Sequence, residues 1–275
     1  MAANHPAPAE LFARESGNGP TVLLLHGLGG DHSIWAEVIE RLSPDLHVIA
    51  PDLRGHGRSP MPPNSTFSTE EMESDLVRLI MERTERAPHP VHVVGLSAGA
   101  FLALRLAHDH PGRVKSLVLV NGAAYCDPHT KEIIQSWQTA FREGGDEGLM
   151  LRLIKDLYDR DWAEAHFEIV DRMHRQFTEP KVGVVVRWAD QLTRFDMRGQ
   201  LARLRVPTLI LQGMSDVVID PSHGRFLRQS IPDSELRLYR DTGHMMPIEK
   251  PQETSDAIRE QVGKVERESP PPPSA

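Results

Sequence analysis

Short apolar segments alternate with longer amphipathic ones along most of the chain. The apolar segments are rich in Val, Ile and Leu and nearly continuous, which is typical of strands that are covered on both faces. The expected strands are Thr21–His26, His47–Ala50, Val91–Leu96, Ser116–Asn121, Thr208–Gln212 and Glu235–Tyr239. Helical spacing of apolar residues predicts helices at about 33–42, 69–86, 98–109, 222–230 and 250–264. This alternation predicts an α/β fold with a mostly parallel sheet and helices on both of its faces.

The alternation stops between Ala123 and Arg205, where large apolar residues recur at helical spacing. One weak strand-like run, Val182–Val186, interrupts that pattern. We interpret this stretch as a helical cap inserted over the sheet. The expected division is a core in two parts (1–122 and 206–265), a cap (123–205) and a Pro-rich disordered tail (266–275).

Most aromatic residues of the cap are expected to fill its own small core, and the rest to line a substrate pocket. The candidates for the pocket are Trp137, Phe141, Trp162 and Trp188. The sequence does not distinguish between these two roles.

Composition and charge exclude several classes of protein. With 39% hydrophobic and 25% charged residues, the chain resembles a soluble globular protein rather than a disordered or fibrous one. A formal net charge of −8 and scattered Arg residues argue against nucleic acid as the main partner. No segment has the ~18 apolar residues that a membrane helix requires. The sequence does not indicate the oligomeric state.

Cys126 is the single cysteine, so an intrachain disulfide is impossible. The first ten residues lack the basic start and apolar stretch of a secretory signal. Together these features favour a reducing, cytoplasmic location.

The strongest local signal is Gly95-Leu96-Ser97-Ala98-Gly99. In a G-x-S-x-G turn, glycines let the chain pass sharply from a strand into a helix and leave the serine hydroxyl exposed at the apex. Here the motif follows the expected strand at Val91 and opens the expected helix at Ala98, which is the setting that the motif requires. Ser97 is therefore the candidate nucleophile.

A serine nucleophile needs a base, and the base needs a carboxylate that orients it. His244 follows the last expected strand and Asp216 follows the one before it, so both lie at the carboxyl edge of the sheet together with Ser97. Asp220 is the alternative acid. It precedes Pro221 at an expected helix start, so helix capping explains it adequately.

The oxyanion of an acyl-transfer intermediate needs two N–H donors. Ala98, next after the nucleophile, supplies one. The segment His26-Gly27-Leu28-Gly29-Gly30 ends the first expected strand, and we choose the Leu28 N–H as the second donor, with Gly29 as the alternative. His26 could serve as another base, but we interpret it as a brace for this loop.

These motifs, together with Pro51-Asp52-Leu53-Arg54-Gly55-His56-Gly57-Arg58-Ser59, resemble the α/β-hydrolase family from about Gly19 to Val262. The order Ser, Asp, His is also the order of that fold. The resemblance implies the α/β-hydrolase fold, places the cap between the sixth and seventh of the family's strands, and gives the Pro51–Ser59 segment a structural role.

Within the family, a serine at the turn, rather than Asp, argues against haloalkane dehalogenases and epoxide hydrolases. The nearest resemblance is to small bacterial carboxylesterases and enol-lactonases, which implies hydrolysis of small-molecule esters or lactones with neither metal nor organic cofactor. Carbon–carbon bond hydrolysis stays open because of Arg187-Trp188 in the cap, although Met rather than Trp follows His244. Acyl transfer on the same triad and a non-catalytic ligand-binding scaffold also stay open, because one fold can host many functions.

Overall fold

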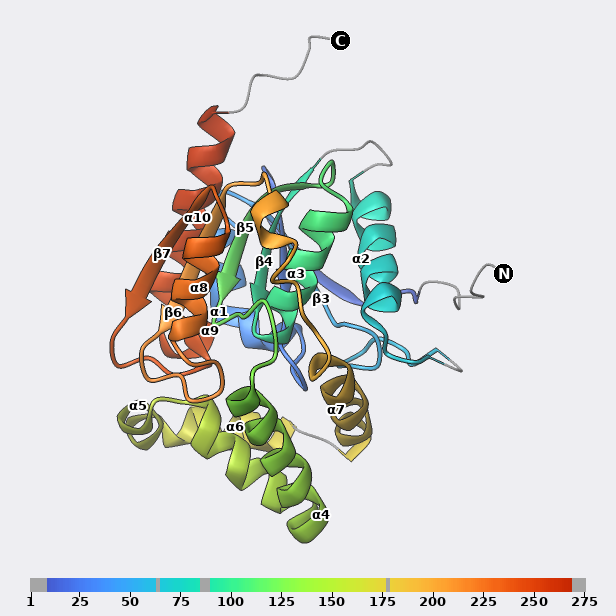
Figure 1. The fold of residues 1–275 in the computed structure, drawn as a ribbon, viewed down its shortest axis with the longest axis vertical. Coiled ribbons are helices and arrows are strands. Elements are labelled where there is room, and N and C mark those ends of the chain that lie inside the picture. The colour runs from blue at the N-terminus through green and yellow to red at the C-terminus, as the bar shows by residue number, and fades with distance from the viewer. Residues whose placement is uncertain (1–8, 63–64, 85–89, 177–178, 269–275) are drawn as a thin grey trace.

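A seven-stranded sheet forms the centre of the computed structural model, which describes residues 9–62, 65–84, 90–176 and 179–268 (Figure 1). The strand order is β1-β3-β2-β4-β5-β6-β7, and the β1–β3 pair is antiparallel while all other pairs are parallel. The strands are β1 (Ala13–Ser16), β2 (Thr21–Leu25), β3 (His47–Pro51), β4 (Val91–Leu96), β5 (Val114–Val120), β6 (Thr208–Gly213) and β7 (Ser234–Tyr239). The six strands predicted from sequence are all confirmed, and the predicted α/β architecture with them.

Strand β1 was missed by the sequence analysis. Its four residues, Ala13-Arg14-Glu15-Ser16, are short and polar, and none of them is fully buried. Because neither face of this edge strand is fully buried, its side chains need not be apolar, and the sequence carries no apolar signal.

Helices cover both faces of the sheet, as predicted. The helices of the core are η1 (His32–Trp35), α1 (Ala36–Leu42), α2 (Thr69–Arg83), α3 (Ala98–Asp109), η2 (Leu201–Arg203), α8 (Ser222–Ser230), α9 (Met246–Glu249) and α10 (Pro251–Glu268). Two separate apolar clusters result. Successive residues of β2 show the division, since Val22 and Leu24 pack with α1 and α10, whereas Leu23 and Leu25 pack with α2 and α3. Side chains of a strand point alternately to its two faces, so a strand buried on both sides must be apolar throughout.

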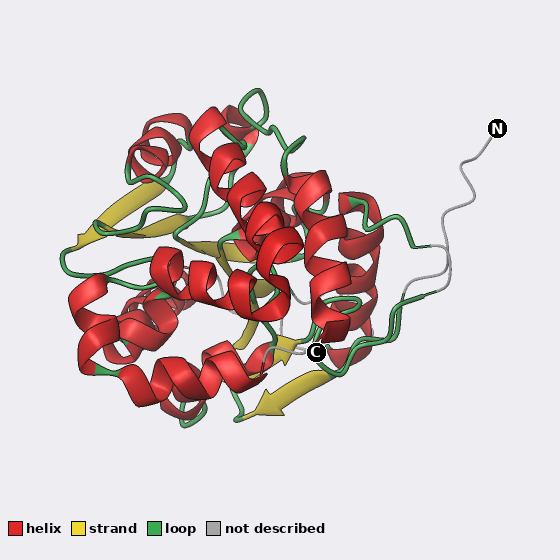
Figure 2. Cartoon of the chain, turned by 90° about the horizontal axis from the view of Figure 1, so that it is seen from below, coloured by secondary structure: helices red, strands yellow, loops and turns green. Residues whose placement is uncertain are grey.

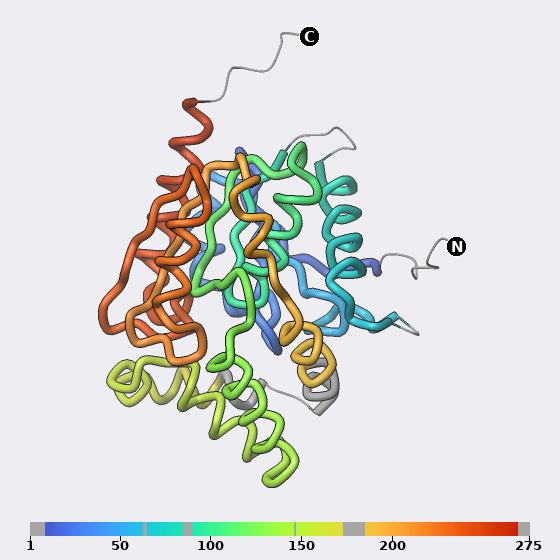
Figure 3. Tube along the Cα trace, viewed as in Figure 1, coloured from blue at the N-terminus to red at the C-terminus, as the bar shows by residue number. Residues whose placement is uncertain are grey.

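The chain leaves the sheet after β5 and returns to it at β6, and it folds into helices in between (Figure 3). These helices are α4 (Pro128–Leu157), α5 (Arg160–Ala165), α6 (Phe167–Gln176) and α7 (Glu179–Leu192), and we call them the insertion. Gly145 adopts a positive φ of 60° inside α4, so the helix breaks there into two arms. The strand-like run Val182–Val186 is helical within α7, so that part of the expectation is wrong. β-branched residues favour strands only where a neighbouring strand offers hydrogen bonds.

The insertion lies across one end of the sheet, the lower end in Figure 1. Seen from below, its helices lie in front of the strands (Figure 2). The loops that follow β2, β4, β5 and β6 approach this same end.

At the carboxyl terminus, α10 continues through Glu268, whereas the sequence analysis began the disordered tail at residue 266. Glu266 holds the end of the helix by accepting a hydrogen bond of 2.6 Å from Lys115 at the start of β5. Residues 269–275, the rest of the expected tail, lie outside the described residues. Within the described ranges, helices long and apolar enough to cross a membrane are absent.

Candidate active site

Ser97 stands at the junction of β4 and α3 with a backbone conformation that L-residues rarely adopt. Its φ is 55° and its ψ is −119°. Such a conformation costs about 1–3 kcal/mol and persists only where the surroundings enforce it. Here the serine N–H is bound to the Val120 carbonyl at 3.0 Å, which fixes the turn against the neighbouring strand.

The glycines on either side of Ser97 allow the turn to form. A Cβ at Gly95 would collide with the backbone of Gly99, and a Cβ at Gly99 would collide with the carbonyl of Leu25 in β2. Gly27 lies against the serine itself, because a Cβ there would be 3.1 Å from the Ser97 Cβ. The G-x-S-x-G motif and the His26–Gly30 loop thus meet at the serine hydroxyl.

His244 and Asp216 form a buried pair beside this turn. The His244 Nδ1 lies 2.8 Å from the Asp216 Oδ2, and both side chains are buried. The other carboxylate oxygen, Oδ1, accepts hydrogen bonds of 2.9 Å from the N–H groups of Val218 and Ile219. With Nδ1 directed to the carboxylate, Nε2 is the nitrogen that remains for a substrate or a nucleophile.

Asp220, the alternative acid, serves a different purpose. Its Oδ1 accepts a hydrogen bond of 2.8 Å from the Ser222 N–H, at the first residue of α8. The Ser222 side chain and N–H hold the pKa of Asp220 below its ordinary value. The structure therefore pairs Asp216 with the histidine and leaves Asp220 at the start of α8.

Asn121, which the sequence analysis assigned only to the end of a strand, joins the two loops of the pair. It is fully buried and has a φ of 45°. Its Oδ1 accepts from the Gly213 N–H at 2.7 Å, at the start of the Asp216 loop. Its Nδ2 donates to the carbonyls of Gly243 and His244 at 3.0 and 2.8 Å. A polar residue closing an otherwise apolar strand is the only sequence signal that could have pointed to it.

Leu28 and Ala98, the predicted oxyanion-hole donors, both line the cavity that opens at Ser97. The alternative donor, Gly29, gives its N–H to the His56 Nε2 at 3.3 Å, and the Gly30 N–H is bound to the Gly27 carbonyl. This favours Leu28 as the second donor.

His26 braces the loop and is absent from the described lining of the cavity. The side chain is fully buried, with Nδ1 2.8 Å from the Gly27 carbonyl and Nε2 accepting from the Leu53 N–H at 2.9 Å. It therefore ties the loop after β2 to the loop after β3.

The cavity lies between the carboxyl edge of the sheet and the insertion. Ser97 and His244 form part of its wall, and α4 contributes apolar side chains that include Ile134, Trp137 and Leu153. The Trp137 indole N–H donates to the buried Asp156 carboxylate at 2.8 Å. Since its one donor is used there, Trp137 presents only its apolar ring to a ligand.

The remaining three aromatic candidates are absent from the described lining of this cavity. Trp162 stacks between Tyr158 and His166, with ring centroids 5.5 and 4.4 Å away. Trp188 is buried and packs edge-on against His56 at 5.2 Å, so it anchors α7 to the core. Phe141 is half-buried against the main apolar cluster. For these three residues, contact with a substrate in the cavity is not supported, because their rings are engaged in packing elsewhere.

Arg187 and Trp188 were the basis for considering carbon–carbon bond hydrolysis. Arg187 is exposed, and neither side chain belongs to the described lining of the cavity. The dipeptide therefore gives no support to that reaction.

The Pro51–Ser59 segment is structural, as expected. Arg54 is fully buried and binds the carboxylates of Asp75 and Glu71 in α2 at 2.7 Å. Such a fully satisfied buried network fixes the path of the loop, whereas removing one partner would leave a buried charge uncompensated.

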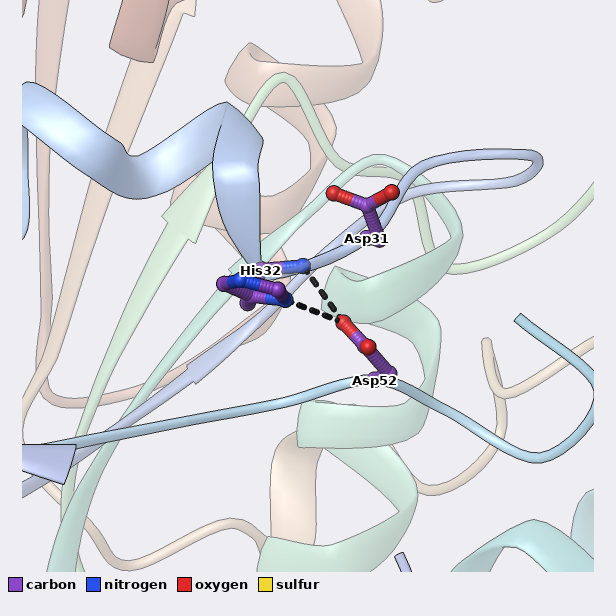
Figure 4. A group of neighbouring side chains, drawn as sticks. All are labelled: Asp31, His32 and Asp52. Carbon is purple, nitrogen blue, oxygen red and sulfur yellow. Dashed lines mark hydrogen bonds and ion pairs between the residues drawn. The ribbon is translucent and has the colours of Figure 1, made fainter. Parts of the chain in front are cut away.

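Asp31, His32 and Asp52 form a cluster whose oxygen and nitrogen atoms lie within 4.8 Å of one another (Figure 4). The Asp52 Oδ1 accepts from the His32 backbone N–H at 2.8 Å and lies 2.7 Å from its Nδ1, while Oδ2 accepts from the Arg58 N–H. The Asp31 carboxylate caps η1 through the Ser33 N–H. Protein donors thus engage both carboxylates, and we interpret the cluster as a brace between two loops rather than as a metal site.

Comparisons with known proteins agree with this architecture. A family described as "alpha/beta hydrolase fold" matches residues 20–251. A thermophilic esterase from Thermogutta terrifontis, crystallised with malate, is 30% identical and superposes with a TM-score of 0.82 over 94% of each chain. An enol-lactonase from Burkholderia xenovorans is 24% identical, with a TM-score of 0.84 over 93% of this chain and 97% of its own.

A protein of similar sequence comes from Pseudomonas syringae. It is named "Putative carbamate hydrolase RutD" and is 27% identical over 91% of this chain and 96% of its own length. The family match covers most of the chain, and it includes the serine turn, the acid loop and the histidine loop. The chain therefore belongs to the α/β-hydrolase family and has its fold.

Proposed function

We propose that this hydrolase cleaves carboxylic esters or lactones of small to medium size through an acyl-enzyme, with Ser97 as nucleophile, His244 as base and Asp216 as the orienting acid. The observation that carries the proposal is the convergence of a serine in a strained strand-to-helix turn and a buried His–Asp pair on one cavity. Strain of this kind at a cavity is typical of a nucleophile held in a reactive position.

In the first half of the reaction, the Ser97 Oγ attacks the carbonyl carbon while the His244 Nε2 takes the hydroxyl proton. The Asp216 carboxylate keeps the imidazole in the required tautomer and stabilises its cation. The N–H groups of Leu28 and Ala98 bind the oxyanion of the tetrahedral intermediate. When the intermediate collapses, the alcohol leaves with the proton that His244 returns to it.

In the second half, water attacks the acyl-enzyme, again with His244 as base, and the acid product leaves. Every proton therefore passes through one imidazole. For a lactone, the alcohol remains part of the acyl group throughout, so the second step releases a single hydroxy acid.

Apolar wall residues from α4 favour an ester with an apolar acyl or alcohol part, since burial of apolar surface contributes about 25 cal/mol per Å². The names of the relatives support hydrolysis at a carbonyl, and the esterase and the enol-lactonase support the ester and lactone classes in particular. Carbamates would use the same nucleophile and base, so they belong in the substrate test.

The test is a panel of p-nitrophenyl esters graded by acyl length, together with lactones and an N-alkyl carbamate, assayed on the wild-type chain and on Ser97→Ala. Ester or lactone turnover that vanishes in Ser97→Ala supports the proposal. Turnover of the carbamate alone would assign the activity to that class. A wild-type chain inert to the whole panel and to a fluorophosphonate would indicate the non-catalytic scaffold.

A further inference from the structure

The loop that carries His244 is hydrogen-bonded to the insertion. The N–H groups of His244 and Met245 both donate to the carbonyl of Leu157, at 2.9 and 3.0 Å. Leu157 is the last residue of α4 and therefore belongs to the insertion. A lid that only covered the pocket would not need a backbone contact with the base.

The next two residues of the insertion also touch this loop. A Cβ at Gly243 would collide with the backbone of Tyr158 and Asp159, so the absence of a side chain at 243 permits the two segments to approach. Leu157 and Tyr158 line the cavity as well. One short segment thus forms part of the substrate pocket and also supports the base.

Glu249, at the end of α9, joins the two segments with its carboxylate. Its Oε2 accepts from the N–H groups of Gly243 and Asp159, at 2.8 and 3.0 Å, and its Oε1 accepts from the Met245 N–H at 3.1 Å. The side chain is 5% exposed. Three N–H groups, two on the histidine loop and one on the insertion, thus bind this one side chain, and the Met245 N–H is shared between Glu249 and the Leu157 carbonyl.

We propose that Glu249 is a positioning residue for the base: it clamps the end of α4 to the His244 loop, and so keeps the imidazole in register with Ser97. This inference rests on the proposed function, since it assumes that His244 is the base. A displacement of about 1 Å at a reacting group can reduce turnover by about 100-fold, so a clamp of this kind has a measurable effect.

Three variants test the clamp. Glu249→Leu removes both acceptor oxygens, and with them all three hydrogen bonds, with little change in volume, whereas Glu249→Gln keeps one oxygen. The matched control is Glu253→Gln, which neutralises an exposed glutamate in the first turn of α10. Each variant is assayed for kcat and KM on p-nitrophenyl butyrate, for the rate of phosphonylation by a fluorophosphonate, and for its thermal midpoint.

We expect Glu249→Leu to lower kcat and the phosphonylation rate by about 100-fold while KM changes by less than about threefold, because the base moves and the apolar wall stays. Glu249→Gln should lie between Glu249→Leu and the wild type, and Glu253→Gln should match the wild type. A purely structural role would lower the thermal midpoint without this separation of kcat from KM.

A folded Glu249→Leu protein with kcat within about twofold of the wild type would overturn the inference. If Glu249→Leu does not fold, Glu249→Gln decides in the same way. An equal loss of kcat in Glu253→Gln would also overturn it, because charge alone would then explain the effect. If Ser97→Ala abolishes turnover while both Glu249 variants keep it, only the clamp is wrong; if Ser97→Ala retains turnover, the proposed function itself is wrong.

Discussion

The parallel strands end at a carboxyl edge and begin at an amino edge of the sheet. Each of these two edges holds a serine, a histidine and a carboxylate, but in different surroundings. At the carboxyl edge are Ser97, His244 and Asp216. At the amino edge, His92 at the start of β4 has its Nδ1 2.7 Å from the Ser116 Oγ and its Nε2 2.9 Å from the Glu266 Oε1.

At the amino edge, His92 lies within hydrogen-bond distance of both Ser116 and Glu266. Ser116 is fully buried within β5, His92 is 2% exposed, and neither belongs to the cavity at Ser97. Glu266 also binds Lys115, so the group ties the end of α10 to the sheet. By contrast, Ser97 stands at a strained turn on a cavity, with glycines that bring N–H groups close to it. Both edges combine a serine, a histidine and a carboxylate, so the cavity and the backbone N–H groups distinguish the candidate catalytic group from the structural one.

Substitution of the two serines should give the largest difference between the edges. Ser97→Ala should lower kcat by about 10⁶-fold, as loss of the nucleophile does in another serine hydrolase. Ser116→Ala should leave ester hydrolysis within about twofold and lower the thermal midpoint by about 2–6 °C, since a buried hydrogen bond is lost. Ester turnover and circular dichroism on both proteins make the comparison. Substantial hydrolysis by pure Ser97→Ala would remove that residue from the mechanism.

Substitution of the carboxylates should give the next largest difference in activity between the two edges. Asp216→Asn should reduce kcat by about 10⁴-fold, because an amide favours the wrong tautomer of His244, as in a protease triad. Asp220→Asn should be nearly neutral because Asn also serves well at helix starts. Glu266→Gln should act on thermal stability alone. A reversed order of Asp216→Asn and Asp220→Asn in an ester assay would show that the acid is misassigned.

Asn121 has no counterpart at the amino edge, and its loss should cost less than that of a triad member. Asn121→Ala leaves the Gly213 N–H and two carbonyls of the histidine loop without their partner. We expect kcat to fall about 10- to 100-fold, because the acid and base loops then shift relative to each other. Leu209→Val, at a buried position within β6, controls for general destabilisation. Equal kcat in the Asn121 variant and the control would refute this role.

Substitution of two tryptophans of the insertion should distinguish a residue that selects the substrate from one that only packs against the core. Trp137→Ala should change the preferred acyl length and raise KM, because its ring lines the cavity. Trp188→Ala should lower stability by about 3–5 kcal/mol with the rank order of esters unchanged, since it fills the space beside His56. Steady-state kinetics on the ester panel and denaturant unfolding measure the two effects. If Trp188→Ala reorders the panel and Trp137→Ala does not, the roles are exchanged.

The smallest expected effect is the response of the amino edge to acid. Burial lowers the pKa of His92 below its ordinary value of 6.5, and hydrogen bonding to Glu266 opposes this only in part. A histidine with a lowered native pKa binds its proton more weakly in the folded state, so its stabilising contribution is complete above pH 6.5 and is lost as the pH falls through the native pKa.

The thermal midpoint of the wild type should therefore fall more between about pH 7 and pH 5 than that of His92→Asn. Differential scanning calorimetry at both pH values provides the measurement. Parallel shifts in the two proteins would show that His92 does not contribute to acid sensitivity.

The sequence predicted the core because its strands are buried on both faces, which leaves a continuous apolar signal in segments such as Val91–Leu96. The candidate triad was predicted for a related reason, since residues that follow parallel strands must meet at one edge of the sheet. Strand β1 was missed because its pairing depends on β3 rather than on its own composition. Val182–Val186 was misjudged because local propensity is weaker than tertiary context.

The insertion was the least predictable part of the chain. Whether an aromatic ring faces the cavity or its own helices depends on how α4 and α7 pack, and hydrophobicity alone does not encode this. Trp137 and Trp188 carry the same signal in the sequence and lie in different places. The hydrogen bonds between Leu157 and the histidine loop are made by backbone atoms, so no side chain in the sequence indicates them.

Mapping the residue that reacts with a fluorophosphonate tests whether Ser97 is the nucleophile. Tryptic cleavage yields a peptide, residues 87–105, in which Ser97 is the only hydroxyl-bearing side chain, while Ser116 lies in a separate peptide, 116–131. We predict that the folded protein gains one adduct, found in peptide 87–105, and that Ser97→Ala gains none. An adduct in peptide 116–131, or an unmodified peptide 87–105 in an enzyme that the reagent has inactivated, would contradict this prediction.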